Sequence, residues 1–249
     1  MGMTKPILFL AAIAVVVSGL VSQARAADPI VVELFTSEGC SSCPPADALL
    51  IEMSQKNVPG VQLILLGEHV DYWNHDGWKD RFSSAQFTER QGEYAKQFHL
   101  DSVYSPQIVI DGHVQAIGNK PAQVSRDLEA AAAEPKPAQV LLQWQGPGKL
   151  HVTVLGAGEG KPKVLLAVTE DGLSTSIHGG ENSGRTLQHA AVVRELRDLG
   201  DAHNGHYEAN LNVASHPDWN RSKLKAVVLV QQPNAGKILG AAAVDFQAQ

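Results

Sequence analysis

The sequence contains only two cysteines among its 249 residues, Cys40 and Cys43. A structural zinc site needs four Cys or His ligands at suitable spacing, and the chain has no second C-x-x-C and no H-x-x-x-H. The chain also lacks a basic run: 26 Asp and Glu outnumber 20 Lys and Arg, for a formal charge of -6. Because nucleic-acid binding depends on a basic surface, this composition argues against a nucleic-acid partner.

Long apolar runs are lacking too. The run near the N-terminus, 7–21, is shorter than the about 20 residues that span a membrane. It follows Lys5 and precedes Ala24-Arg25-Ala26, as in an export signal with a small-x-small cleavage site. We therefore expect a signal peptide at 1–26 and a periplasmic or secreted mature chain without stable membrane insertion; the alternative is an uncleaved anchor. Cleavage leaves 18 basic and 26 acidic residues, a formal charge of -8.

A proline-rich segment at 135–138 divides the rest of the chain. It follows an alanine-rich run and carries two prolines in three residues, which ends a helix and is typical of a linker. Strand and helix patterns alternate before it, whereas nearly every pattern after it is a strand. We therefore predict an α/β domain at 27–134 and an all-β, sandwich-like domain at 139–249.

In the first domain the patterns follow the order βαβαββα. The predicted elements are a strand at 30–35, a helix ending near Gln55, a strand at 61–66, a helix at 86–98, a hairpin of strands at 107–110 and 114–117, and a helix from about Pro121 with Asn119 as its N-cap. Alternating strands and helices imply parallel strands, and the hairpin adds antiparallel ones. The sequence therefore predicts a mixed sheet.

The two cysteines stand where the first strand gives way to the first helix. A C-x-x-C pair at such a junction is typical of a redox site, because two intervening residues on a tight turn bring the sulfurs within bonding distance. We assign Cys40 as the nucleophile, open to solvent, and Cys43 as the resolving thiol. A helix beginning at Cys43, with Ser42 as its cap, leaves Cys40 just outside the strongest field of the helix amides. The alternative is an inert structural staple.

Together with Tyr104-Ser105-Pro106, the cysteine pair resembles the active site of the thioredoxin fold, in which a cis-proline loop faces the dithiol. The resemblance implies that Pro106 is cis and that the backbone of Ser105, beside Tyr104, can pair with an incoming peptide. Without it, an ordinary trans proline at a strand start is expected. The chain departs from thioredoxin in lacking a Trp before the first cysteine and a Gly-Pro between the two. Redox direction and potential are therefore not carried over.

A closer resemblance is to a family of secreted bacterial proteins known as domain of unknown function 1223. It rests on VELFTSEGCSSCPPAD at 32–47, HVDYW at 69–73 and GWKD at 77–80, and it runs from about Val31 to the end of the chain. This resemblance implies a thioredoxin-like fold but no established activity. Function is therefore inferred from the chemistry of the residues.

A polar and aromatic segment, 68–84, follows the second strand. Five ionisable residues lie within nine positions, among aromatic ones: Glu68, His69, Asp71, His75 and Asp76, with Tyr72, Trp73 and Trp78. A loop at the carboxyl end of a parallel strand lies on the same edge as the C-x-x-C. We interpret it as one wall of a substrate groove, with His69, Asp71 and Trp73 binding substrate and His69 or Asp71 carrying a proton. The alternative is a lid whose Trp side chains pack on the sheet.

The second domain has strand patterns throughout. They lie at 139–144, 149–155, 163–169, 191–196, 206–213, 224–231 and 237–244. We interpret the glycine-rich loop 177–185 as a solvated connection; the alternatives are contact with the first domain near its site and binding of a partner. His203, His206 and His216 have no Cys or carboxylate at metal spacing, so we expect them at the surface or in turns.

These patterns indicate an exported thiol-disulfide oxidoreductase that acts on protein or small-molecule disulfides through Cys40, Cys43 and Pro106, without a cofactor or an assigned metal. The alternative is a non-catalytic protein that uses the same cysteines structurally or to bind Cu(I). His69 would then be a further ligand, because thiolates and imidazole suit Cu(I).

Overall fold

The structure, a computed structural model, describes Met1 and residues 28–56 and 61–246. Apart from Met1, the predicted signal peptide lies outside the described residues. The first half contains β1 (Ile30–Thr36), α1 (Pro44–Gln55), β2 (Leu63–His69), α2 (Ala85–Gln97), β3 (Gln107–Ile110), β4 (Val114–Ile117) and α3 (Pro121–Ala132). This order confirms βαβαββα. The bounds predicted for the second strand are wrong, because β2 continues through its polar end by pairing with β1 as far as His69.

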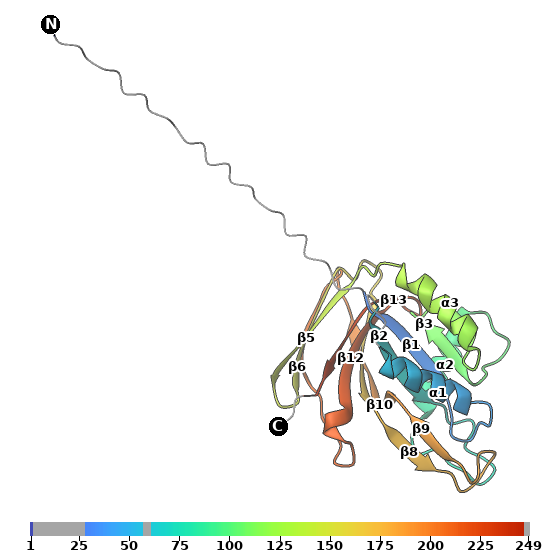
Figure 1. The fold of residues 1–249 in the computed structure, drawn as a ribbon. Helices are drawn as coiled ribbons and strands as arrows, with labels where there is room; N and C mark the ends of the chain where they lie inside the picture. The colour runs from blue at the N-terminus through green and yellow to red at the C-terminus, as the bar shows by residue number, and fades with distance from the viewer. Residues whose placement is uncertain (2–27, 57–60, 247–249) are drawn as a thin grey trace.

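The strand β1 is buried along its whole length. Val32 and Leu34 pack with α1 and α3 on one face of the sheet, whereas Phe35 packs against Tyr94 of α2 on the other. In Figure 1, α1 and α3 lie in front of these strands. Successive side chains of a strand point to opposite faces, so an almost wholly apolar strand fits a sheet that helices cover on both sides. Residues 37–43, which follow β1, therefore start at the edge of the sheet where α1 begins.

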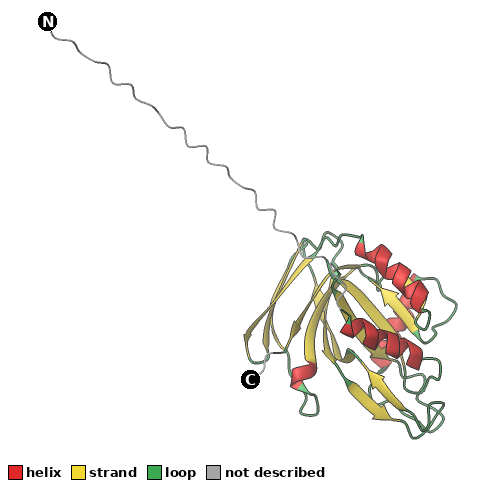
Figure 2. Cartoon of the chain, viewed as in Figure 1, coloured by secondary structure: helices red, strands yellow, loops and turns green. Residues whose placement is uncertain are grey.

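Up to residue 246, where the described part of the chain ends, the second half consists of strands and one short 3-10 helix, as Figure 2 shows in yellow and red. They are β5 (Gln139–Gly146), β6 (Lys149–Leu155), β7 (Lys163–Glu170), β8 (Leu173–Ser176), β9 (Thr186–His189), β10 (Val192–Asp201), β11 (Tyr207–Asn212), η1 (Arg221–Lys223), β12 (Leu224–Gln231) and β13 (Ile238–Asp245). The sequence does not predict β8 and β9, because LSTS and TLQH have too few apolar residues to show a strand pattern. Within the described ranges, no helix has the length and hydropathy of a membrane span.

A single eight-stranded sheet runs through both halves, in the order β13-β12-β7-β10-β2-β1-β3-β4. The halves join where Val192 of β10 pairs in parallel with Gly67 of β2. Two antiparallel sheets complete the fold, β11-β6-β5 and the hairpin β8-β9. The protein is therefore mixed α/β, with a large mixed sheet and additional antiparallel sheets. The predicted linker at 135–138 lies between parts that share the large sheet, and the division into two domains stays a prediction.

The sheet β11-β6-β5 packs on the second-half strands of the large sheet. Leu150 and Val152 of β6 share one apolar cluster with Leu166 of β7 and Val228 of β12. At the edge of this interface, the backbone N–H of Ala138 donates to the carbonyl of Leu239 at 2.9 Å. The segment that leads into β5 thus lies directly against β13.

This close passage gives a stability prediction. A Cβ added at Gly240 would lie 2.1 Å from the carbonyl oxygen of Ala138, and neither backbone can move without disturbing the sheet. We expect Gly240→Ala to lower the free energy of unfolding in urea by about 1–3 kcal/mol, as overpacking does. The matched control is Gly92→Ala in α2, where an added Cβ meets nothing within 4 Å. It should raise stability by about 0.5–1 kcal/mol; equal effects from the two variants would contradict the prediction.

Candidate functional site

The cysteine pair forms a disulfide at the start of α1. Cys40 and Cys43 are joined with their Cα atoms 5.4 Å apart. Cys43 is the N-cap of α1, followed by two prolines, and no side chain caps the helix. The prediction of Ser42 as the cap is therefore wrong: its hydroxyl instead lies 3.3 Å from the sulfur of Cys40. Proline suits these first helical positions because their N–H groups have no partner within the helix.

Both cysteines are fully buried, with 0% of their surface exposed. The prediction that Cys40 is open to solvent is therefore wrong. Its neighbours Ser41 and Ser42 are exposed, so the disulfide lies one layer below the surface. Trp73 lies against the loop here, because a Cβ added at Gly39 would come within 2.7 Å of the Trp73 carbonyl oxygen.

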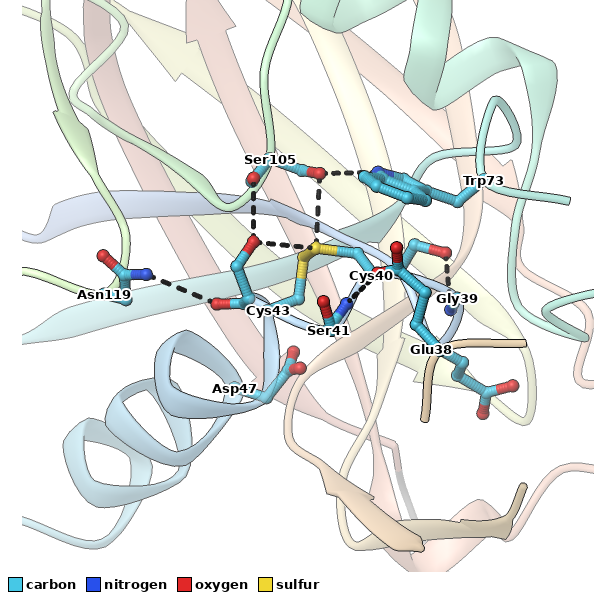
Figure 3. Close-up of a disulfide and its surroundings, with 12 residues drawn as sticks. Glu38, Gly39, Cys40, Ser41, Cys43, Asp47, Trp73, Ser105 and Asn119 are labelled. Carbon is cyan, nitrogen blue, oxygen red and sulfur yellow. Dashed lines mark hydrogen bonds between the residues drawn. A yellow bond between two sulfur atoms is a disulfide. The ribbon is translucent and has the colours of Figure 1, made fainter. Parts of the chain in front are cut away.

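The segment at 104–106 meets the disulfide as expected. The Ser105–Pro106 peptide bond is cis, which confirms the prediction for Pro106. The hydroxyl of Ser105 donates to the sulfur of Cys40 at 3.5 Å and accepts from the indole N–H of Trp73 at 2.7 Å. Figure 3 shows Ser105 and Trp73 beside the disulfide, with Asp47 of α1 below it.

The hydrogen bonds of Tyr104 are made to residues other than the two cysteines. Its hydroxyl bonds to the side chain of Gln115, and its carbonyl accepts from the amide of Gln91 at 2.7 Å. Burial raises the pKa of Tyr104 to about 12, so the phenol stays protonated at neutral pH. Asn119, predicted as the N-cap of α3, is also placed differently: Lys120 is the N-cap, and the Asn119 amide donates to the carbonyl of Ser42 at 3.4 Å.

His69 and Asp71 have partners other than the disulfide. The Nδ1 of His69, which is 1% exposed, lies 2.7 Å from a carboxylate oxygen of Asp80. Burial would raise the pKa of Asp80. The charge of His69 and the hydrogen bonds that Asp80 accepts outweigh burial and lower the pKa of Asp80 to about 2. Asp71 accepts from the hydroxyl of Thr88 at 2.6 Å. No contact with a sulfur supports a proton-carrying role for either residue.

A second buried histidine, which the sequence does not single out, lies next to residues 37–43, the cysteine loop. His189 of β9 has its Nε2 3.5 Å from a carboxylate oxygen of Glu38 and its Nδ1 3.8 Å from one of Asp47. Its ring packs against that of His69, with centroids 4.8 Å apart. Burial alone would lower the pKa of His189, but the two carboxylates raise it to about 9. A charged histidine therefore lies between the cysteine loop and α1.

The loop 177–185 reaches the cysteine loop. The side-chain amide of Asn182, which is 0% exposed, donates to the carbonyls of Glu38 and Cys40, both at 2.9 Å. The carboxylate of Glu181 accepts from the backbone N–H of Ser41 at 2.9 Å. The interpretation of this loop as a solvated connection is therefore wrong, and the alternative, contact with the first half near its site, is confirmed.

The described residues contain no group of three His, Cys, Asp or Glu side chains placed to hold a metal ion. The set of Cys40, Cys43 and His69 therefore gains no support as a Cu(I) site. His203, His206 and His216 are exposed, which confirms their predicted place at the surface.

Comparisons with known proteins agree with the resemblance seen in the sequence. A family model described as "Protein of unknown function (DUF1223)" matches residues 31–231. The chain belongs to this family. The match spans the cysteine loop, the segment at 68–84 and the loop 177–185, so the contacts of the cysteine loop described in this subsection lie within the DUF1223 region. No curated protein matches the chain.

A crystal structure of a protein from Agrobacterium tumefaciens is similar over most of both chains. It has a TM-score of 0.73 and 28% sequence identity, over 88% of this chain and 95% of that one. A domain of the outer membrane lipoprotein Omp28 from Porphyromonas gingivalis has a TM-score of 0.28 and 13% identity, over 46% of this chain and 91% of that one. The second likeness is too low to support a conclusion. The DUF1223 fold described here is thus shared with the Agrobacterium protein.

Proposed function

We propose that this DUF1223 protein is an exported thiol-disulfide oxidoreductase with a thioredoxin-like first half, acting on protein or small-molecule disulfides. The observation that carries the proposal is the Cys40–Cys43 disulfide at the β1–α1 junction, with the Ser105 hydroxyl 3.5 Å from the sulfur of Cys40. A staple would join parts of the chain far apart, whereas this bond closes a turn of four residues and gains little from chain entropy. Export rests on the sequence pattern of residues 1–26.

The proposed reaction is a two-step exchange. In the reduced protein, the thiolate of Cys40 attacks one sulfur of the substrate disulfide, forming a mixed disulfide while the other substrate sulfur leaves with the electron pair and takes a proton. Cys43 then loses its proton and attacks the sulfur of Cys40, which re-forms the Cys40–Cys43 bond and releases the second substrate thiol. The substrate gains two electrons and two protons, and the protein dithiol loses them. The same steps run in reverse when the protein acts as the oxidant.

Access to Cys40 needs a local movement. The sulfur lies under Ser42 and Ser105, and the indole of Trp73 is bonded to the Ser105 hydroxyl. These contacts are weak individually, since a hydrogen bond of this kind contributes about 0.5–1.5 kcal/mol. Displacement of Trp73 and Ser105 by a substrate strand would therefore open the sulfur at modest cost, and these two residues are the proposed substrate contacts.

The test compares single-cysteine variants with the wild type in an insulin-reduction assay driven by dithiothreitol. We expect the wild type to accelerate precipitation of insulin chains, and Cys40→Ser and Cys43→Ser to fall to the uncatalysed rate because each lacks one step of the exchange. Cys43→Ser should in addition trap a mixed disulfide through Cys40, visible by mass spectrometry. The matched control is Ser125→Ala, an exposed hydroxyl of α3, with wild-type activity. Wild-type protein that neither reduces insulin nor exchanges with glutathione disulfide would overturn the proposal, whether or not it binds Cu(I).

A further inference from the structure

The peptide bond between Cys40 and Ser41 is held on both of its polar groups by two consecutive residues of the second half. Its carbonyl accepts from the amide of Asn182 at 2.9 Å, and its N–H donates to the carboxylate of Glu181 at 2.9 Å. The C=O and N–H of a trans peptide point to opposite sides, so the two side chains restrain this peptide plane from both sides. The N–H of Cys43 adds a third restraint, because it donates to the same Cys40 carbonyl at 3.2 Å. We name Glu181 and Asn182 the clamp.

The side chain of Asn182 is fully buried, and its amide nitrogen and oxygen are both hydrogen-bonded. Its two amide hydrogens are directed to the carbonyls of Glu38 and Cys40, and its oxygen accepts from the guanidinium of Arg185 at 2.8 Å. Backbone hydrogen bonds join the two ends of the loop around Asn182. The N–H of Ile177 donates to the carbonyl of Arg185 at 2.8 Å, and the N–H of Gly184 donates to the carbonyl of Ile177 at 2.9 Å. An amide with every group paired in a closed turn is a rigid support.

We propose that the clamp positions Cys40 and shifts the equilibrium of the Cys40–Cys43 pair toward the disulfide. The inference rests on the proposed function and deepens it, since it assigns two positioning residues to the same dithiol. A backbone that folding has already fixed loses little further entropy when the bond closes, which raises the effective concentration of one thiol at the other.

The carboxylate of Glu181 also favours the disulfide over the dithiol. A thiolate at Cys40 is stabilised by N–H groups that point to it and destabilised by nearby negative charge. Glu181 occupies the N–H of Ser41 and adds a negative charge next to it, and this hydrogen bond lowers the pKa of Glu181. The negative charge therefore destabilises the thiolate of the reduced form, whereas the disulfide form carries no thiolate for it to act on.

The test is the equilibrium between the protein dithiol and a glutathione redox buffer, read by alkylation and mass spectrometry. We expect Asn182→Ala to lower the equilibrium constant for disulfide formation about tenfold, which corresponds to a reduction potential about 30 mV more positive. Glu181→Gln should shift it in the same direction by a smaller factor, with a lowered pKa of the Cys40 thiol. The matched controls are Asn212→Ala and Glu159→Gln, exposed residues of the second half, with the wild-type constant.

Both clamp variants are checked for folding by circular dichroism in the oxidised form. If Asn182→Ala does not fold, the surface variant Glu181→Gln decides. Folded variants that keep the wild-type equilibrium constant and thiol pKa would overturn the clamp. The outcome is separate from that of the insulin assay: shifted constants without insulin reduction would support the clamp and refute the oxidoreductase. A wild-type disulfide that resists dithiothreitol while the variants are reduced would likewise support the clamp and refute the oxidoreductase.

Discussion

Replacement of Arg90 by Met is expected to lower the free energy of unfolding by about 3–5 kcal/mol, the cost of leaving a buried charge without its partner. The Nε of Arg90 lies 2.6 Å from a carboxylate oxygen of Glu33, which is 0% exposed, and 3.5 Å from one of Glu68. Burial, and then the charge of Glu33, raise the pKa of Glu68 well above its usual range. Arg90 is therefore the cation that makes a carboxylate tolerable in this part of the core.

The measurement is urea unfolding at pH 7 followed by circular dichroism. Arg126→Met is the matched control, because Arg126 is exposed on α3 and a surface change of this kind stays within about 0.5 kcal/mol. Arg90 also donates to Gln231 and Tyr94, both at 3.1 Å, so part of the loss comes from these neutral partners. A loss below about 1 kcal/mol for Arg90→Met would show that the buried carboxylate does not depend on this cation.

Raising the pH from 6 to 9.5 should remove about 3 kcal/mol of stability that comes from His189. Its pKa in the folded protein is about 9, against 6.5 for an ordinary histidine. A folded-state pKa above the unfolded one gives stability that is complete below pH 6.5 and is lost as the pH rises through 9. The groups that face the ring are the carboxylates of Glu38 and Asp47 and the imidazole of His69.

The measurement compares urea unfolding at pH 6 and pH 9.5 for the wild type and His189→Gln. A glutamine does not titrate, so the alkaline loss attributed to this site should be absent from the variant. His216→Gln removes an exposed histidine and should keep the full wild-type loss. Parallel pH profiles for the wild type and His189→Gln would contradict the assignment of a raised pKa to this ring.

The elements of the first half were accessible from sequence because each carries its own local signal. The hairpin strands β3 and β4 have the predicted bounds, since the Asp111-Gly112 turn between them is a strong short-range pattern. The prediction of a cis bond at Pro106 rests on the resemblance to the thioredoxin fold, because the local sequence around Pro106 does not indicate a cis bond. The burial of Cys40 was missed because it depends on Trp73 and Ser105, which lie 32 residues apart and are joined by one hydrogen bond.

The sequence offers contact of the loop 177–185 with the first half only as an alternative, because the loop carries no local signal for its partner. Asn182 lies 142 residues from its partner Cys40, and nothing in a glycine-rich loop indicates which backbone it will meet. His189 lies in β9, a strand whose sequence is too polar to be recognised. The joining of the two halves was hidden for the same reason, since β10 meets β2 through one pair of residues. Long-range pairings of this kind depend on the assembled fold.

The clamp lies 140 residues beyond the cysteine loop that it holds. A ribosome adds about 5–20 residues per second, so Cys40 and Cys43 are synthesised roughly 7–28 s before Glu181 and Asn182. During that interval the Cys40–Ser41 peptide lacks the hydrogen bonds that Asn182 and Glu181 make to it in the folded protein. The clamp therefore acts only on a chain whose synthesis has passed residue 182.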